Sequence, residues 1–451
     1  MKSYHLIAIG GAVMHNLALA LKNRGNSVSG SDDEIYEPAK SRLQAAGILP
    51  QKIGWDASRI HQNLDGIVLG MHAKNDNPEL IKAKELGLKI WSFPEFMYEN
   101  SKEKLRVVIA GSHGKTTLTA MAMHILRAEN RDFDYLVGSK LDGFETMVRL
   151  SDSAKLLIVE GDEYLSSPID RRPKFLLYHP QIALISGIAW DHINVFPTLE
   201  EYEHQFALLV QALPENGTLV YCAEDERLVE LVARYSNGKN LDLIPYQTPD
   251  YFIENGTFII RKNNSRFPLK LIGKHNLLNL SGIMKVLEKL GISAEKCLEH
   301  MAGFTGAASR LERIFEDKNR VVFRDFAHSP SKLKATVEAV TELYGSDRVL
   351  AVFELHTFSS LNKAFLSQYA GALDSVKRKI VYLDSHTLAH KGMPAISADE
   401  ISAAFGDDSI VFVSDSAALK ASIEGLKSGK DVFLMMSSGN FGGLKLPDDL
   451  C

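Results

Sequence analysis

The sequence predicts an α/β protein of three domains with parallel sheets, on the basis of its length and of one repeating pattern. At 451 residues, the chain is too long for one ordinary hydrophobic core, so we expect two or three domains. Short apolar runs alternate with helix-like segments along the whole length. This alternation is typical of parallel sheets that helices cover on both faces.

The first hundred residues are predicted to form a small Rossmann-like domain. Its strands are expected at residues 6–9, 28–32, 67–69 and 89–91. The first apolar run ends in Gly10 and Gly11, and a helix-like stretch follows them, as in a nucleotide-binding βαβ unit. Ala8 replaces the first glycine of the usual fingerprint, so this loop alone indicates only weakly that a nucleotide binds.

Two further units follow the same pattern. Strands of the second are expected at residues 106–110, 156–159 and 182–185, with a polar, β-leaning stretch at residues 251–271. Strands of the third are expected at residues 320–323, 349–353, 379–383, 410–413 and 431–436. The domain boundaries predicted from these patterns are 1–104, 105–303 and 304–451.

Composition excludes several classes of protein. Hydrophobic residues make up 45% and charged residues 24% of the chain, which is typical of a soluble globular protein. A net charge of -5 gives no basic footprint for nucleic acid. The apolar runs are too short to insert into a membrane, and the first residues lead straight into a strand, so we expect a cytoplasmic protein. The three cysteines lack the spacing of metal ligands.

The strongest motif is a phosphate-binding loop at residues 110–117, which read Ala-Gly-Ser-His-Gly-Lys-Thr-Thr. It follows an apolar strand and precedes a helix-like run, as such a loop requires. Its two glycines let successive N–H groups point at phosphate oxygens, Lys115 adds a positive charge, and Thr116 offers a hydroxyl to magnesium. Ile109 stands where the general pattern has a glycine, so the loop is a short variant. A glycine-rich turn without a ligand is the alternative, which this context disfavours.

Acidic and imidazole groups follow two later strands. Residues 159–164 read Val-Glu-Gly-Asp-Glu-Tyr, and residues 189–192 read Ala-Trp-Asp-His. Alone, each group is more often a solvated loop or a structural histidine. Since the carboxyl ends of parallel strands meet at one edge of a sheet, both should lie beside the phosphate loop, where carboxylate oxygens suit magnesium. The combination predicts an ATP and Mg²⁺ site.

In order and spacing, these motifs resemble those of the Mur ligase superfamily. Further matching segments are residues 273–276 (Gly-Lys-His-Asn) with Asn279, Arg310, and residues 325–330 (Asp-Phe-Ala-His-Ser-Pro). The resemblance covers essentially the full chain. It implies a Rossmann-like domain for a UDP-linked substrate, a central P-loop ATPase domain with a parallel sheet, and a Rossmann-like C-terminal domain for the amino donor.

The resemblance also implies roles for individual residues. ATP would be bound by Gly111, Ser112, His113, Gly114, Lys115, Thr116, Thr117, His275, Asn276, Asn279, Arg310 and Asp325. UDP-muramate would be held by Gly10, Gly11, Ser31 and Asp32. The catalytic residues would be Lys115, Glu160 and His192, and the magnesium ligands Thr116, Glu160 and His192. For Asn276 and Asn279 the alternative is capping of a helix end. Many relatives carry a carbamylated lysine after the Asp-His pair, and this chain has no lysine between His192 and Gly217, so a second magnesium would need other ligands.

The reaction implied by the resemblance is ATP-dependent amide formation on the lactoyl carboxylate of UDP-N-acetylmuramate, in the metabolism of the peptidoglycan cell wall. Residues 160–164, 170–175 and 438–443 resemble the recycling branch, whose donor is L-alanyl-γ-D-glutamyl-meso-diaminopimelate. Residues 354–360 resemble instead the branch that adds L-alanine during peptidoglycan synthesis. We expect the tripeptide as donor, with L-alanine as the alternative. Cations that could pair with the tripeptide's carboxylates are Arg171, Arg172 and Lys363.

Two functions from other classes remain open at this point: an NTPase that switches a partner, and a nucleotide-binding regulator without catalysis. No switch segment is evident by motif, and Lys115, Thr116, Glu160 and His192 argue against a non-catalytic role.

Overall fold

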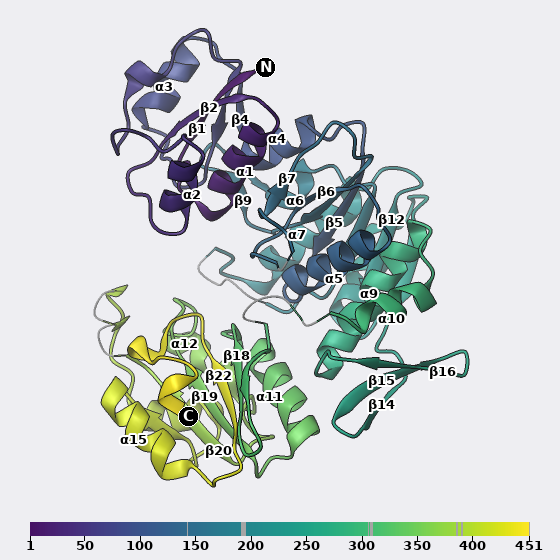
Figure 1. The fold of residues 1–451 in the computed structure, drawn as a ribbon, viewed down its shortest axis with the longest axis vertical. Helices are drawn as coiled ribbons and strands as arrows, with labels where there is room; N and C mark the ends of the chain where they lie inside the picture. The colour runs from purple at the N-terminus through teal and green to yellow at the C-terminus, as the bar shows by residue number, and fades with distance from the viewer. Residues whose placement is uncertain are drawn as a thin grey trace. The chain divides into compact units, whose positions relative to one another are not determined.

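The computed structural model describes residues 1–141, 143–190, 195–304, 306, 310–384, 387–388 and 391–450. The chain divides into two compact units (Figure 1). The first unit comprises Met1–Ile188 and Tyr202–Tyr246, and the second comprises Ala189–Glu201 and Gln247–Cys451. None of the helices within the described residues combines the length and hydropathy needed to cross a bilayer.

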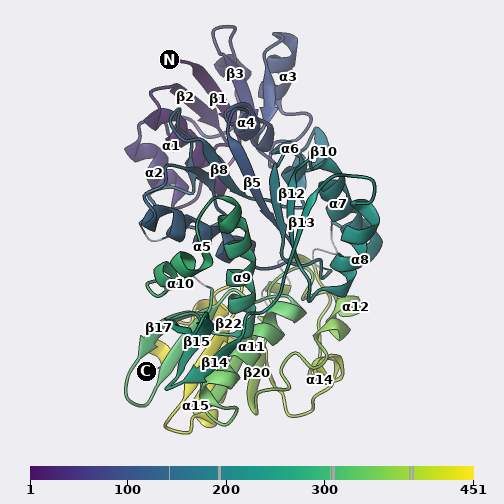
Figure 2. The same ribbon diagram turned by 90° about the vertical axis from the view of Figure 1, so that its right-hand side faces the viewer.

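The N-terminal part of the first unit is a parallel sheet with the strand order β2-β1-β3-β4. Figure 2 shows strands β1, β2 and β3 of this sheet. The strands are β1 (Ser3–Ile7), β2 (Ser27–Ser31), β3 (Gly66–Leu69) and β4 (Ile90–Ser92), and the helices are α1 (Ala12–Asn23), α2 (Ala39–Ala45), α3 (Pro78–Glu85) and α4 (Phe93–Glu99). Apolar side chains such as Ile67 and Leu69 of β3 pack against Leu80 of α3. Helix α4 begins at a capping box formed by Ser92 and Glu95, which satisfies N–H groups of its first turn. Each strand overlaps the apolar run that predicted it, although β1 begins three residues before the predicted stretch 6–9 and ends two residues before its end.

A second, larger sheet in the first unit has the order β13-β12-β11-β5-β8-β6-β7. Its strands are β5 (Leu105–Ala110), β6 (Asp134–Leu136), β7 (Val148–Arg149), β8 (Leu156–Glu160), β11 (Ile182–Ile185), β12 (Thr218–Cys222) and β13 (Asp242–Tyr246). The flanking elements are helices α5 (Lys115–Ala128), α6 (Lys174–Leu177), α7 (Leu199–Ala212) and α8 (Glu226–Tyr235), and the hairpin β9 (Leu165–Ser167) with β10 (Asp170–Pro173). The pairs are parallel except β6 with β7. Because β5 lies between β11 and β8, three carboxyl ends meet at one edge.

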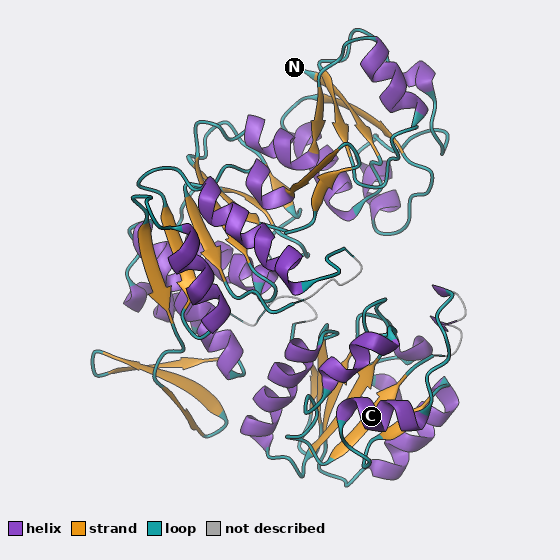
Figure 3. Ribbon diagram, turned by 180° about the vertical axis from the view of Figure 1, so that it is seen from behind, coloured by secondary structure: helices purple, strands orange, loops and turns teal. Residues whose placement is uncertain are grey.

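The second unit contains a small antiparallel sheet, β14 (Tyr251–Glu254), β15 (Thr257–Lys262) and β16 (Ser265–Leu269), as Figure 3 shows. The turns that join its strands, Asn255-Gly256 and Asn263-Asn264, have positive φ angles at both residues. Such left-handed pairs match the twist of tight hairpins, which explains why this polar stretch is antiparallel. Helices α9 (Lys274–Lys289) and α10 (Ala294–Met301) follow it.

The C-terminal sheet of the second unit has the order β17-β18-β22-β19-β20-β21, in which only the β17–β18 pair is antiparallel. Its strands are β17 (Glu312–Glu316), β18 (Val321–Asp325), β19 (Val349–Glu354), β20 (Arg378–Tyr382), β21 (Val411–Val413) and β22 (Val432–Met436), and the helices described with it are α11 (Pro330–Tyr344), α12 (Lys363–Leu366), α14 (Ala398–Phe405) and α15 (Ser416–Leu426). Strands β19 and β22 are buried along their whole length, as expected for central parallel strands between helices. The predicted α/β fold class with parallel sheets is confirmed.

A buried ion pair links the residue before β5 to β6, which lies on the other side of β8 in the larger sheet. The Lys104 ammonium, just before β5, bonds the Asp134 carboxylate at the start of β6 and the carbonyl of Ser151. The same carboxylate accepts the N–H of Ser151 at 2.9 Å and its hydroxyl at 2.8 Å. Asp134 is fully buried and the side chain of Lys104 is 8% exposed. The two charges are therefore shielded from water, and each compensates for the cost of burying the other.

We predict that Asp134→Ala destabilises the first unit by about 3 kcal/mol, because the substitution leaves the Lys104 ammonium buried without its carboxylate. Urea unfolding followed by circular dichroism measures the change. Asp152→Ala is the control, since Asp152 pairs with Arg24 while 90% exposed, and it should unfold at the wild-type urea concentration. Equal midpoints for the two variants would show that the buried pair contributes nothing.

Candidate active site

The loop between β5 and α5 has the backbone that phosphate binding requires. Gly111 and Gly114 adopt φ angles of 125° and 79°, which other residues rarely adopt. A Cβ at Gly111 would lie 2.2 Å from the Ser186 hydroxyl oxygen, so no larger residue fits there. The Ser112 N–H donates to the Gly187 carbonyl at 2.9 Å. Segments after β5 and β11 thus hold the loop in a fixed shape at the N-terminus of α5, where the helix dipole favours anions.

Lys115, the first residue of α5, lies against the loop with its ammonium already bonded. Its Nζ donates to the Gly111 carbonyl at 2.7 Å and to the Glu163 carboxylate at 3.0 Å. Burial opposes the charged form, but the carboxylates of Glu163 and Asp162 outweigh it and raise the pKa of Lys115 above its usual value. The residue is therefore a permanent cation at neutral pH.

Glu160 ends β8 beside Thr116, as the sequence predicted for neighbouring strand ends. One carboxylate oxygen accepts the Thr116 hydroxyl at 2.8 Å, and the other accepts the Gly138 N–H at 2.7 Å. Burial and the nearby Asp162 raise the pKa of Glu160. A carboxylate and a hydroxyl side by side are hard oxygen donors, so this pair fits magnesium. The remaining predicted ligand, His192, lies outside the described residues together with Asp191.

Two residues that the sequence did not single out as site residues complete the cluster. Glu163, three residues after Glu160, is fully buried and holds Lys115. Tyr202 of α7 is also fully buried, and its hydroxyl lies 2.9 Å from the Ser112 hydroxyl and 3.3 Å from Glu163. Tyr202 is 90 residues away from Ser112 in sequence, and a tyrosine on the apolar face of a helix is normally core, so no pattern indicated its contact.

The predicted UDP-binding residues fall into two groups. Gly10 donates its N–H to Asp32 at 2.7 Å. A Cβ at Gly10 would lie 2.9 Å from the same carboxylate, so a larger residue at position 10 would disturb this contact. Burial raises the pKa of Asp32 to about 6. Ala8, which replaces the first glycine of the fingerprint, adopts a positive φ of 65°. Ser31 is different, because its hydroxyl is fully buried and donates to Glu79 of α3 inside the domain.

The other predicted ATP-binding residues lie in the second unit, around α9 and β18. Asn276 does not cap α9 through its oxygen; its side-chain N–H donates to the Ile272 carbonyl at 2.9 Å. Burial lowers the pKa of His275. Asp325 ends β18 and accepts the N–H of Ala327 at 2.8 Å as well as the N–H of Leu311, so its carboxylate holds two loops together.

Arg310 is adjacent to this carboxylate, and its guanidinium lies over the ring of Phe326 at 4.8 Å from the centroid. Phe326 is 36% exposed, so the stacked pair presents a flat, cationic surface next to Asp325. Asn279 lies on α9, one turn beyond His275. The structure therefore places His275, Asn276 and Asn279 on one helix, α9. Arg310 and Asp325 lie close together at the end of β18.

The C-terminal sheet brings together the two segments that the sequence assigned to different branches. Glu354 ends β19, is 2% exposed, and accepts the Phe441 N–H at 2.9 Å and the Ser437 hydroxyl. The Ser438 hydroxyl lies 3.3 Å from the His356 ring nitrogen Nδ1, and the Lys391 ammonium bonds the His356 carbonyl. A Cβ at residue 439 would meet His356 at 2.7 Å. Residues 354–360 and 438–443 thus form one site at the carboxyl ends of β19 and β22.

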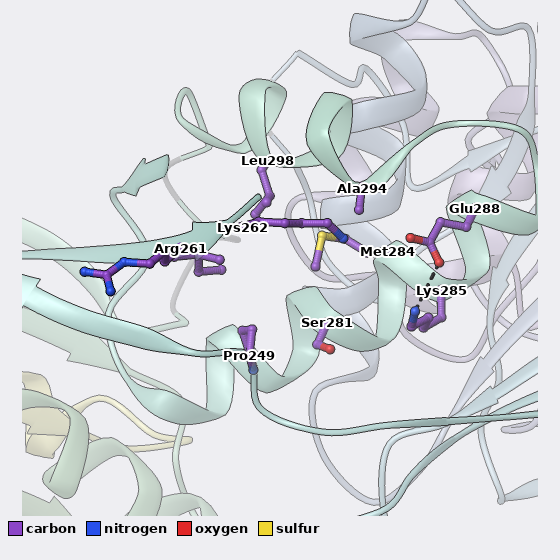
Figure 4. Close-up of a pocket in the computed structure, with 10 residues that line it drawn as sticks. Pro249, Arg261, Lys262, Ser281, Met284, Lys285, Glu288, Ala294 and Leu298 are labelled. Carbon is purple, nitrogen blue, oxygen red and sulfur yellow. Dashed lines mark hydrogen bonds and ion pairs between the residues drawn. The ribbon is translucent and has the colours of Figure 1, made fainter. Parts of the chain in front are cut away.

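A cavity of about 140 Å³ lies elsewhere in the second unit, between β15 and helices α9 and α10 (Figure 4). Apolar residues such as Ile260, Met284 and Leu298 line it. Lys285 and Glu288 at its rim form an ion pair at 3.2 Å with each other. No residue predicted from the sequence to bind a ligand is among its described lining residues.

Comparison with known proteins identifies the family along nearly the whole chain. Residues 3–104 match the description "Mur ligase family, catalytic domain", residues 109–286 "Mur ligase middle domain", and residues 309–439 "Mur ligase, glutamate ligase domain". The UDP-N-acetylmuramate–L-alanine ligase of Caldicellulosiruptor bescii is 31% identical over 418 residues, which cover 89% of this chain and 88% of that one.

Two solved structures have the same fold. The UDP-N-acetylmuramate–alanine ligase of Thermotoga maritima is 22% identical with a TM-score of 0.70, covering 98% of this chain and 96% of that chain. The UDP-N-acetylmuramate:L-alanyl-γ-D-glutamyl-meso-diaminopimelate ligase of Neisseria meningitides is 27% identical with a TM-score of 0.61, covering 67% of this chain and 98% of that one. The chain therefore belongs to the Mur ligase family, the ATP-dependent ligases that form amide bonds.

Proposed function

We propose that this chain joins L-alanine to the lactoyl carboxylate of UDP-N-acetylmuramate, with ATP and magnesium, in peptidoglycan synthesis. The observation that carries the proposal is the Lys115–Glu160–Thr116 cluster at the phosphate loop, in a chain 31% identical to a ligase of that name. In this proposal residues 1–104 bind the UDP part, residues 105–303 bind ATP, and residues 304–451 bind the amino donor. Gly10, Gly11 and Asp32 are the contacts proposed for the UDP part.

The proposed chemistry follows from the poor reactivity of a carboxylate toward an amine. A carboxylate oxygen attacks the γ-phosphorus of ATP, ADP leaves, and an acyl phosphate forms. The amine then attacks the acyl carbon and inorganic phosphate leaves. Such transfer depends mainly on positioning and on neutralising charge. Lys115 supplies the fixed cation for the phosphate oxygens. Thr116, Glu160 and, as predicted, His192 would hold magnesium, which when bound neutralises further phosphate charge.

The choice of L-alanine over the tripeptide rests on charge as well as on the relatives. The tripeptide carries several carboxylates, and two of the three cations expected to pair with them already have acidic partners. Arg172 bonds Asp170 at 2.6 Å, and Lys363 bonds Glu400 at 2.6 Å. At the C-terminal site, Lys391 is the cation that approaches His356 among the described residues. One cation suits a donor with one carboxylate.

The tripeptide ligase is the second candidate. It is supported by the resemblance of residues 170–175 and 438–443 to the recycling branch, and by the 27% identity to the structure from Neisseria.

We predict that Lys115→Ala and Glu160→Ala each lower kcat at least a hundredfold without unfolding the protein. Each substitution removes charge stabilisation at the transferring phosphate, where one preorganised contact is worth roughly 3–4 kcal/mol. ADP release measures turnover. Lys82→Ala and Glu85→Ala, which break an exposed ion pair on α3, are matched controls and should retain full activity. Near-wild-type turnover in either site variant would refute its assignment.

We also predict that the reaction passes through an acyl phosphate. When the lactoyl carboxylate of UDP-N-acetylmuramate carries ¹⁸O at both oxygens, one label should appear in the released phosphate, because that oxygen bridges carbon and phosphorus in the intermediate. Mass spectrometry of the phosphate is the measurement. Amide formation accompanied by unlabelled phosphate would exclude this pathway.

The amino donor is tested by competition at equal concentrations of L-alanine and L-alanyl-γ-D-glutamyl-meso-diaminopimelate, because specificity is a ratio of kcat/KM values. We expect the alanine product to exceed the tripeptide product at least tenfold by mass spectrometry. A dominant tripeptide product would replace the proposed donor by the second candidate while leaving the ligase chemistry intact.

A further inference from the structure

A fully buried carboxylate lies directly behind the phosphate-loop lysine. Glu163 follows β8 by three residues and is 0% exposed. One of its oxygens accepts the Lys115 ammonium at 3.0 Å, and the other lies 3.3 Å from the Tyr202 hydroxyl. Each carboxylate oxygen therefore has a polar partner that holds it in place. A charge buried this deeply is retained only where it is paired.

The contacts of Lys115 show what this carboxylate does to the ammonium. A lysine ammonium has three N–H donors and no acceptor. Two are used inside the protein, by the Gly111 carbonyl at 2.7 Å and by Glu163. Because these two bonds fix the direction of the third N–H, the ammonium presents one donor, at a set place, to a phosphate oxygen. A flexible lysine without them would have to be ordered each time ATP binds.

Tyr202 fixes the carboxylate in turn. Its hydroxyl lies 2.9 Å from the Ser112 hydroxyl, and the Ser112 N–H donates to the Gly187 carbonyl at 2.9 Å. A single phenol oxygen therefore links helix α7, the phosphate loop and the acidic segment after β8. Tyr202 is 0% exposed, and its ring packs edge-on against Phe206 at 5.3 Å between centroids. Because the ring is packed in the core, the position of the hydroxyl is fixed.

We propose that Glu163, held by Tyr202, is a positioning residue that orients the Lys115 ammonium for phosphoryl transfer. The proposal rests on the ATP-dependent ligase function. Glu163 repels the phosphates of ATP while it aims the lysine, so it weakens or leaves unchanged the binding of ATP and accelerates the chemical step. An interaction that raises kcat without strengthening the binding of ATP in the ground state stabilises the transition state. A purely structural carboxylate would lack this signature.

The first test is Glu163→Gln, which keeps the size and one acceptor oxygen and removes the charge. We expect kcat to fall 10- to 100-fold, whereas the dissociation constant of ATP, measured by calorimetry, falls or stays within threefold of wild type. A kcat within threefold of wild type would overturn the proposal. Turnover is followed as ADP release with whichever amino donor the wild type uses, so an error in the proposed donor shows in the wild type and leaves the comparison intact.

The second test asks whether Glu163 acts through Lys115, by a double-mutant cycle. In the Lys115→Ala background, Glu163→Gln should change kcat by less than threefold, because the group it positions is gone. If Glu163→Gln lowers kcat by the same factor in both backgrounds, Glu163 acts independently of the lysine and the proposal fails.

A tyrosine pair keeps the proposal testable if Glu163→Gln does not fold. Tyr202→Phe removes only the hydroxyl, and we expect kcat to fall 3- to 10-fold with an unchanged dissociation constant for ATP. Tyr246→Phe is the matched control, since Tyr246 is 3% exposed in the same unit and its hydroxyl has no hydrogen-bond partner among the described residues. It should retain wild-type kcat. Equal kcat values for the two tyrosine variants would contradict the role given to Tyr202.

Discussion

The ion pair between Lys115 and Glu163 is the interaction on which the architecture of the phosphate site depends. The Glu163 carboxylate is fully buried and the Glu160 side chain is half-buried, and such charges are costly without partners. Lys115, the hydroxyl of Thr116 and the N–H of Gly138 provide those partners. When both carboxylates are ionised they outnumber the single ammonium of Lys115, so a divalent cation would complement the site better than a bare anion.

The parallel sheet places these groups together. Ile109 of β5 pairs with Glu160 of β8, and Ala110 pairs with Ile185 of β11. Each strand therefore ends at the same level, and the segments that follow it face the phosphate loop. Because all three strands are nearly fully buried, their register is set by the core, and a slip by one residue would turn Glu160 to the other face. The geometry of the candidate active site is therefore a consequence of strand packing.

What the sequence predicted well is local in the chain. The phosphate loop, the strand ends and the alternation of apolar runs were readable because each is encoded within about ten residues. Contacts between segments far apart in the chain could not be predicted from such local patterns. The Ser31 hydroxyl bonds Glu79, 48 residues later, a contact that no local pattern indicated. The Tyr202 hydroxyl contacts the Ser112 hydroxyl, 90 residues earlier in the chain. Strand β17 was missed because no residue of Glu312–Glu316 is buried, so the segment has no apolar run typical of a central parallel strand.

The contacts of Glu160 also connect the N-terminal and central parts of the chain, which belong to one compact unit. Gly138, which donates its N–H to Glu160, follows Val137, whose own N–H bonds the Met147 carbonyl at 3.0 Å. The Met147 N–H in turn donates to Asn16 of α1 at 3.0 Å. Helix α1 begins directly after Gly10 and Gly11, so the segment that supports the proposed metal ligand is anchored on the helix that follows the proposed UDP-binding loop. Backbone and hydrogen bonds therefore connect the segment beside Glu160 to helix α1.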